Sequence, residues 1–296
     1  MPGQLKEVRN RIKSVQSTQQ ITKAMKMVSA AKLRKAQDAI VQMRPYAQKL
    51  QEILSNIVSN SDGDLGALNL GAERPVQKVL IVLITSDRGL CGGYNANLIK
   101  TVRGLIQSKY AEQKEKGNVQ IWGVGKKGVE FYQRSDIPTS DNYRDLFLQL
   151  SFASVQTMAQ AIIEGFLKGN FDVVELVYSE FKNAASQIFR TERFLPIPKA
   201  AKQETGKTKK ADFIFEPAKE TLIGELMPKI LNTQLYKAVL DAQASEHGAR
   251  MTAMDKASDN ANELLRSLRI SYNRARQAAI TTELTEIVSG AAALNG

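Results

Sequence analysis

The sequence is poor in the residues on which metal and catalytic sites depend. Its 296 residues include one cysteine, one histidine and one tryptophan, and only 6% are aromatic. A single cysteine excludes an internal disulfide framework and suits a reducing compartment. The only histidine, His247, lies among Ser245, Glu246 and Gly248, where we expect a solvated or seam residue and no metal ligand. We therefore predict no metal site and no bound cofactor.

Long apolar runs are also missing. None reaches the ~18 residues needed to cross a bilayer, and the first residues are charged, without the apolar block of a secretory signal. The sequence thus predicts neither a membrane span nor a cleavable leader.

Acidic residues are scarce at the amino terminus. The chain carries a net charge of +11, and residues 1–60 hold eleven lysines and arginines against three acids. Such an imbalance indicates an acidic partner, either nucleic acid or an acidic protein surface, with a merely solvated face as an equally weighted alternative. Readers of single-stranded nucleic acid interleave aromatic and basic residues, but Tyr46 is the only aromatic residue in this stretch.

An unbroken heptad pattern occupies the first 58 residues. A helix over about 4–58 would be roughly 80 Å long, too long for an ordinary globular core. The seam positions alternate by three and four residues, as in coiled coils. They are Leu5, Val8, Ile12, Val15, Gln19, Thr22, Lys26, Ser29, Leu33, Ala36, Ile40, Met43, Ala47, Leu50, Leu54 and Ile57.

The carboxyl-terminal stretch offers a matching seam. Its members are Met251, Met254, Ser258, Ala261, Leu265, Leu268, Tyr272, Ala275 and Ala279. We predict that the two ends form a long antiparallel coiled coil, with two amphipathic helices of an ordinary bundle as the alternative. The prolines at positions 45 and 228 are expected to kink their helices, and Gly248 to soften the last one.

The middle of the first seam is polar. Gln19, Thr22, Lys26 and Ser29 occupy successive seam positions, while Ile21, Met25 and Val28 place apolar groups on an adjoining face. This pattern indicates a second surface engaged there, with a locally loosened coiled coil as the alternative.

Between the two ends the sequence pattern is typical of a small Rossmann-like α/β domain. The predicted boundaries are a helix over 1–60, an α/β body over 76–196, an exposed loop over 197–217 and a helix over 218–296. Alternating strands and helices predict a largely parallel sheet with right-handed crossovers. We expect strands at 79–85, 119–124, 171–181 and, at an edge, 187–195, with helices ending near 108 and spanning 126–133 and 154–168.

Two glycine-rich segments bear on nucleotide binding. Gly123, Gly125 and Gly128 form a G-x-G-x-x-G after a strand, but the following helix is short and no ribose-binding acid is clearly placed. Residues 87–93 follow the first strand but lack the Lys-Ser/Thr of a P-loop. No G-x-S-x-G is present. These features argue against an enzyme.

The last residues form an apolar face that is displaced from the seam. Its members are Ile280, Leu284, Ile287, Ala291 and Leu294, with Arg274, Arg276, Gln277, Thr281, Thr282 and Glu283 beside them. An apolar tip without a helical partner predicts a binding cavity in another protein.

Three segments resemble a known family. Residues 17–28 with 31–35, residues 86–93 and residues 272–288 look like the three signatures of the gamma subunit of F-type ATP synthase, in order and with family-like spacing. The resemblance implies a non-catalytic rotor shaft that couples proton-driven rotation of a c-ring to conformational cycling of the catalytic sites on beta subunits. A basic coiled-coil protein that binds nucleic acid is the alternative function.

The resemblance also implies partners and a location. Three alpha and three beta subunits would surround one shaft, and the epsilon subunit and the c-ring would bind its other parts, with no nucleic acid involved. Association with the membrane would occur only through the complex, at the cytoplasmic face of the bacterial inner membrane.

Contact residues follow from the resemblance, position by position. A contact with an acidic lever loop of beta is implied for Lys23, Met25, Lys26, Lys32 and Arg34. A second contact with beta is implied for Asp87 and Arg88. A catch on beta and an apical collar are implied for Arg250, Arg276, Gln277, Ile280, Thr281, Glu283, Leu284 and Ile287. Lys26 departs from relatives that carry an acid there, and the cysteine-bearing regulatory insertion of photosynthetic relatives is missing, so thiol control and a chloroplast origin are not expected.

Overall fold

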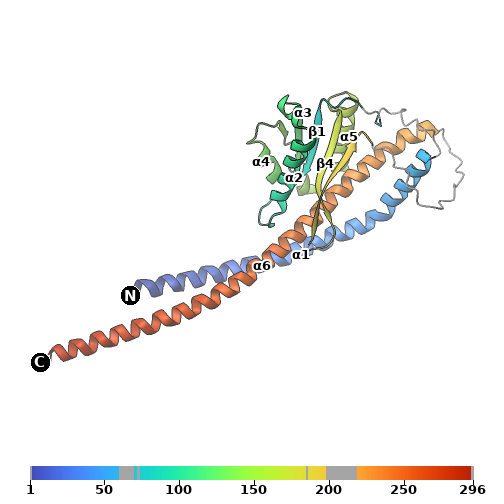
Figure 1. The fold of residues 1–296 in the computed structure, drawn as a ribbon. Helices are drawn as coiled ribbons and strands as arrows, with labels where there is room; N and C mark the ends of the chain where they lie inside the picture. Colours follow the sequence, from blue (N-terminus) through green and yellow to red (C-terminus); the bar gives the residue numbers. More distant parts are fainter. Residues whose placement is uncertain (1, 60–69, 72–73, 185, 198–218, 295–296) are drawn as a thin grey trace. The chain divides into compact units, whose positions relative to one another are not determined.

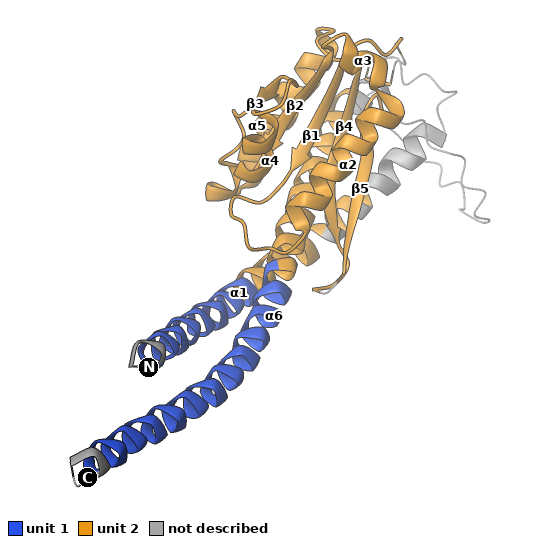
Figure 2. Cartoon of the chain, turned by 60° about the vertical axis from the view of Figure 1, so that its left-hand side comes forward, with its two compact units in different colours: residues 1–30, 250–296 blue, residues 31–249 orange. Residues whose placement is uncertain are grey.

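The computed structural model describes residues 2–59, 70–71, 74–184, 186–197 and 219–294 (Figure 1). They form two compact units, coloured in Figure 2. The first joins residues 1–30 to residues 250–296, and the second comprises residues 31–249. Helices α1 (Pro2–Ser59) and α6 (Lys219–Leu294) each contribute to both units, and neither is interrupted at Pro45 or Pro228. Residues 61–75, between the predicted helix and the predicted body, and the predicted exposed loop over 197–217 fall mostly outside the described residues.

The first unit is an antiparallel pair of helices, as predicted. Side-chain hydrogen bonds join α1 to α6, and the two residue numbers of each bonded pair add up to 280 or 281, the signature of an antiparallel register. The pairs are Arg9 with Tyr272, Gln19 with Asn262, Thr22 with Ser258 and Lys26 with Asp255. Figure 1 shows the two helices side by side.

Burial follows the predicted heptad seam. In the first unit the α6 positions Met254, Ala261, Leu265 and Leu268 are buried. On α1, Thr22 and Ser29 are buried, and the apolar positions before them are half-buried. In the second unit the α1 seam continues with buried Leu33, Ala36, Ile40 and Leu50. The side chains of Leu54 and Ile57 lie outside the described residues.

The second unit contains a five-stranded sheet in the order β3-β2-β1-β4-β5. Strands β1 (Val79–Ile84), β2 (Val119–Val124), β3 (Thr139–Ser140) and β4 (Val173–Phe181) are parallel, and β5 (Gln187–Leu195) is antiparallel to β4 at the edge. The predicted α/β class is confirmed. The elements missing from the prediction, β3, α3 (Ala111–Glu115) and the 3₁₀ helix η2 (Leu146–Gln149), are too short to show a periodic pattern.

Helices cover both faces of this sheet. All six residues of β1 are buried, which explains its unbroken apolar sequence. Val79, Ile81 and Leu83 pack toward α2 (Tyr94–Lys109), in a core that also includes Tyr132 of α4 (Lys126–Tyr132). The alternate β1 residues pack toward α5 (Phe152–Leu167) and the 227–242 part of α6.

Polar contacts also join α6 to the body of the second unit. The hydroxyls of Ser179 and Ser245 lie 2.6 Å apart, and the Tyr94 hydroxyl donates to the carbonyl of Ala242 over 3.0 Å. His247 is buried, which fits the expectation of a seam residue and not its solvated alternative. A Cβ at Gly248 would lie 3.2 Å from the Cα of Ala184, so glycine allows a close approach of backbones there.

Candidate partner interfaces

The polar middle of the coiled-coil seam is internally paired. Hydroxyl oxygens of Thr22 and Ser258 lie 2.8 Å apart, and the Ser258 hydroxyl donates to the carbonyl of Met254 over 2.8 Å. The neighbouring turns hold the Gln19–Asn262 hydrogen bond and the Lys26–Asp255 ion pair. These contacts account for the polar seam positions without a loosened coil.

These three pairs, Gln19–Asn262, Thr22–Ser258 and Lys26–Asp255, form a polar belt in the seam. Beside the polar belt lies the apolar face expected from the sequence. Ile21 and Val28 are 56% and 57% exposed, and Met25 between them is half-buried. Lys23 is exposed nearby, as are Lys32 and Arg34 further along α1. Lys26 differs from these cations because its ammonium group already has a carboxylate partner in α6.

The turn after β1 holds Asp87 and Arg88 at the carboxyl edge of the sheet. The Ser86 hydroxyl donates to the carbonyl of Arg88 over 2.7 Å, and the Ser86 backbone N–H donates to Asn95 Oδ1 over 3.1 Å. Leu90 has a φ of 63° and is 67% exposed. The structure therefore holds this turn in one conformation from within and leaves the Leu90 side chain in solvent.

Asp87 is poorly solvated for a carboxylate. Its Oδ1 is buried without a hydrogen-bond partner in the described part of the chain. Burial raises the pKa of this carboxyl, and the backbone N–H and the charge of Lys126 oppose that rise. The adjacent Lys126 ammonium group itself pairs with Asp145 at 3.0 Å. A charged group kept at such a cost is a candidate for a role in binding.

The glycine motif after β2 serves internal packing. A Cβ at Gly125 would lie 2.1 Å from the Thr85 carbonyl oxygen, and one at Gly128 would lie 2.8 Å from the Thr85 side chain. A Cβ at Gly123 would lie 2.2 Å from Val129. The Gly128 N–H donates to the Thr85 hydroxyl over 2.9 Å. These glycines let α4 pack against the end of β1, which explains the motif without a phosphate.

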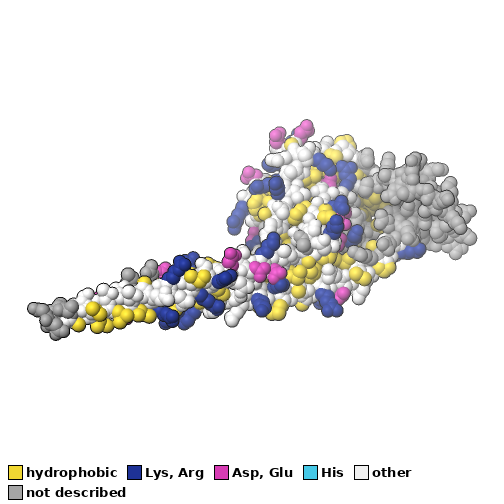
Figure 3. Space-filling model, turned by 60° about the horizontal axis from the view of Figure 1, so that its bottom comes forward, with side chains coloured by type: hydrophobic (Ala, Val, Ile, Leu, Met, Phe, Trp, Pro, Cys, Tyr) yellow, Lys and Arg dark blue, Asp and Glu magenta, His cyan; other side chains and the backbone are white. Residues whose placement is uncertain are grey.

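The last turns of α6 expose an apolar face. Ile280, Leu284, Ile287 and Val288 are between 49% and 67% exposed. The register of the paired residues places no described part of α1 opposite them. Figure 3 shows hydrophobic side chains along one edge of the narrow end of the coil.

Most residues of the predicted catch lie next to this face, but one does not. Arg276, Gln277, Thr281 and Glu283 are exposed within two turns of α6. Arg250 is only 8% exposed and lies 26 residues before Arg276, about 39 Å along a straight helix. The structure therefore does not bring Arg250 together with the other predicted catch residues.

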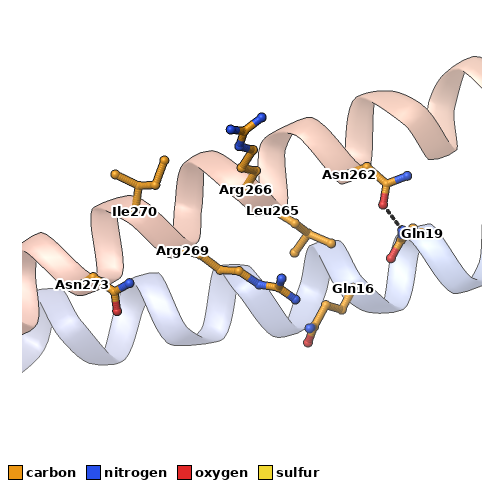
Figure 4. A pocket seen from close by; sticks show the side chains of 8 residues that line it. All are labelled: Gln16, Gln19, Asn262, Leu265, Arg266, Arg269, Ile270 and Asn273. Atoms are coloured by element: carbon orange, nitrogen blue, oxygen red, sulfur yellow. Dashed lines mark hydrogen bonds between the residues drawn. The ribbon is translucent and has the colours of Figure 1, made fainter.

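A groove that the sequence analysis missed lies between α1 and α6, with a volume of about 360 Å³ (Figure 4). Two arginines and four amides line it, together with the apolar side chains of Leu265 and Ile270. The polar residues are Arg266, Arg269, Gln16, Gln19, Asn262 and Asn273. The only signal in the sequence was the position of both arginines directly after seam leucines.

The comparisons with known proteins cover the whole chain. A family model described as ATP synthase matches residues 4–294. The ATP synthase gamma chain of Cytophaga hutchinsonii is 52% identical over 297 residues, which cover 100% of both chains. That of Chlorobaculum parvum is 49% identical over 98% of both. The chain belongs to the ATP synthase gamma chain family.

A solved structure shares the fold of this chain. A chain from the mitochondrial ATP synthase of Euglena gracilis, solved as OSCP/F1/c-ring in rotational state 3, has a TM-score of 0.64. The match covers 99% of this chain and 95% of that chain at 21% identity, so the likeness concerns the fold. Family membership confirms the resemblance first noted in residues 17–35, 86–93 and 272–288. As in the sequence, no helix within the described ranges combines the length and the apolar character of a membrane span.

Proposed function

We infer that this gamma chain is the central rotor shaft of an ATP synthase, a non-catalytic subunit that couples proton-driven rotation of a c-ring to conformational cycling on the beta subunits. Full-length family membership supports this function. The observation that carries it is the exposed apolar end of α6 on an antiparallel coil. Such an exposed apolar surface indicates a partner with a cavity that covers it. Because the relatives are named ATP synthase gamma chain, we expect that partner among the other subunits of an ATP synthase.

The coil is suited to this role because its faces differ. The side around Met25 is apolar and basic, while other faces carry polar residues and acids. A turning shaft would present each beta subunit with a different face in turn. A partner with several conformations shifts toward the one that a given face binds best, so rotation becomes a sequence of population shifts.

Three sets of residues are proposed as contacts with beta. Exposed Lys23, Lys32 and Arg34 are available to an acidic lever loop, with Met25 as its apolar contact and Lys26 sharing its charge with Asp255. Asp87 and Arg88 form the second contact. The catch and the collar would engage Arg276, Gln277, Thr281, Glu283 and the apolar tip, while the buried Arg250 would act from a separate position on α6.

The proposed assembly has three alpha and three beta subunits around one shaft, with epsilon and the c-ring as further partners. The shaft would reside at the cytoplasmic face of a bacterial inner membrane, attached through the complex. The nucleic-acid alternative has no support in the family assignment.

Reconstitution with purified alpha and beta subunits tests the proposal. We expect a stable complex of three alpha, three beta and one gamma with higher ATPase activity than alpha and beta alone. Met25→Arg should lower coupling between rotation and hydrolysis, with Val41→Arg as the control because it places the same charge at an exposed apolar residue of α1 outside the proposed contacts. A chain that neither binds the ring nor changes its turnover would overturn the proposal.

A further inference from the structure

We propose that the groove between α1 and α6 around Gln16 and Arg269 is a docking site for a carboxylate side chain from an acidic segment of the surrounding alpha or beta subunits. This inference rests on the rotor function proposed above and adds a contact outside the three sets of residues named there. It starts from the groove itself, which lies within the first unit.

The groove is basic and has no acid in its lining. Arg266 and Arg269 are exposed, and within the described residues neither guanidinium forms an ion pair or a hydrogen bond. Two other cations of the same coil are engaged, since Arg9 donates to Tyr272 and Lys26 pairs with Asp255. The two groove arginines therefore present uncommitted positive charge at one place.

The two arginines have different positions in the groove. In Figure 4 the Arg269 side chain extends toward α1 near Gln16, whereas Arg266 points away from α1 at the rim. Leu265 points toward α1 and closes the floor between them. An incoming side chain would thus meet a guanidinium and an amide at the base and a second guanidinium at the edge.

This set of groups matches a carboxylate on a short apolar stem. An arginine fork donates two parallel hydrogen bonds to a carboxylate, and amide N–H groups add further donors. Leu265 and Ile270 can cover the methylene groups of an aspartate or glutamate. The volume of about 360 Å³ is near the lower end of the ~300–1,000 Å³ typical of ligand pockets, enough for part of a loop.

The surroundings favour an acidic protein over nucleic acid. No aromatic residue lines the groove, so it offers no surface on which bases could stack. Arg269 lies 15 residues before Leu284 on α6, about 22 Å along the helix. A ring that encloses the apolar tip would therefore have segments close to the groove.

The test compares charge removal inside and outside the groove. Arg266→Gln/Arg269→Gln and the control Arg11→Gln/Lys13→Gln each remove two exposed positive charges from the same unit. Each variant is assembled with alpha and beta, and dissociation of gamma is followed at several salt concentrations. We expect the groove variant to dissociate on the order of tenfold faster than the control at low salt, with a weaker salt dependence. Arg266→Lys/Arg269→Lys should recover part of the loss because it keeps the charge without the fork.

A photo-crosslinking residue at position 16 identifies the occupant, which we expect to be an acidic segment of alpha or beta. If wild-type gamma fails to assemble, the rotor function is refuted and this inference falls with it. If wild-type gamma assembles but the groove variant behaves like its control, or the cross-link reaches a segment without acids, only the groove proposal is overturned. Selective loss of nucleic-acid binding in the groove variant would also overturn it.

Discussion

The same substitution, Leu→Ala, can be made at two positions of α6, one in the coiled-coil seam and one in the apolar tip, and its effects compared. Leu265 is 5% exposed in the seam, and Leu284 is 57% exposed near the end of the helix. Leu→Ala removes three carbons in both cases, and each fully buried methylene contributes about 0.8 kcal/mol to stability. Leucine and alanine are both good helix formers, so the substitution changes helix propensity little. We expect Leu265→Ala to lower the free energy of unfolding by about 2–3 kcal/mol and Leu284→Ala by about 1 kcal/mol at most.

For assembly with alpha and beta we expect the opposite order, with Leu284→Ala weakening binding more than Leu265→Ala. If a collar covers the part of Leu284 that is exposed in the free chain, its deletion costs about 1.4 kcal/mol of binding, roughly tenfold in Kd. Urea unfolding followed by circular dichroism at 222 nm measures the first effect, and titration of gamma into alpha and beta measures the second. The reasoning is refuted if Leu284→Ala destabilises the free chain as much as Leu265→Ala, or if it leaves assembly unchanged.

Three further predictions concern charged and titrating groups. The side chains of Lys26 and Asp255 are 40% and 48% exposed, so a double-mutant cycle should give a coupling below about 1 kcal/mol that shrinks in 1 M salt; a coupling above about 2 kcal/mol would indicate a desolvated pair. Burial raises the pKa of Tyr132 to about 12, against about 10 when unfolded, so its stabilisation is complete below about pH 10 and is lost as the pH rises to about 12. Tyr132→Phe should flatten the alkaline fall in stability relative to Tyr46→Phe, and equal slopes would contradict this. Because burial raises the pKa of Asp87, its charge costs stability at neutral pH, and Asp87→Asn should raise Tm at pH 7 by more than at pH 4; a lower Tm at pH 7 would count against it.

The large elements were predictable because each carries a long periodic signal. The heptad alternation marked the residues that turned out buried in α1, and Met254, Ala261, Leu265 and Leu268 among those buried in α6. The apolar run of β1 predicted a buried strand, and all six of its residues are buried. The short β3 strand gave no such signal, since two residues cannot show a period. For His247 the sequence left a solvated and a seam position open, because its polar neighbours in the sequence do not show what packs around it; the residue is buried.

The candidate contacts were less predictable because binding surfaces are exposed in the free chain and obey no packing rule. The apolar tip was an exception, since Ile280, Leu284 and Ile287 leave the seam while remaining apolar. The groove depends on the register of α1 against α6, which places Gln16 opposite Leu265. That register is a property of the pair of helices and cannot be seen in either sequence segment alone. The spacing of Gly123, Gly125 and Gly128 matched a nucleotide motif, but the backbone contacts that decide their role appear only when Thr85 is placed beside them.

The polar belt of the coil has a physical role that the sequence left open. In other coiled coils, a single polar residue in the seam fixes the register at a cost in stability. Thr22–Ser258 and its neighbouring pairs occupy seam positions where apolar residues would stabilise the coiled coil more. Their benefit is specificity, because a slip of one turn along the axis would separate each donor from its acceptor and leave buried Thr22 without its partner. An apolar seam tolerates such a slip far better. A shaft that transmits torque needs one fixed register between its two helices, and the belt supplies it at the level of α1 where Met25 faces outward beside it.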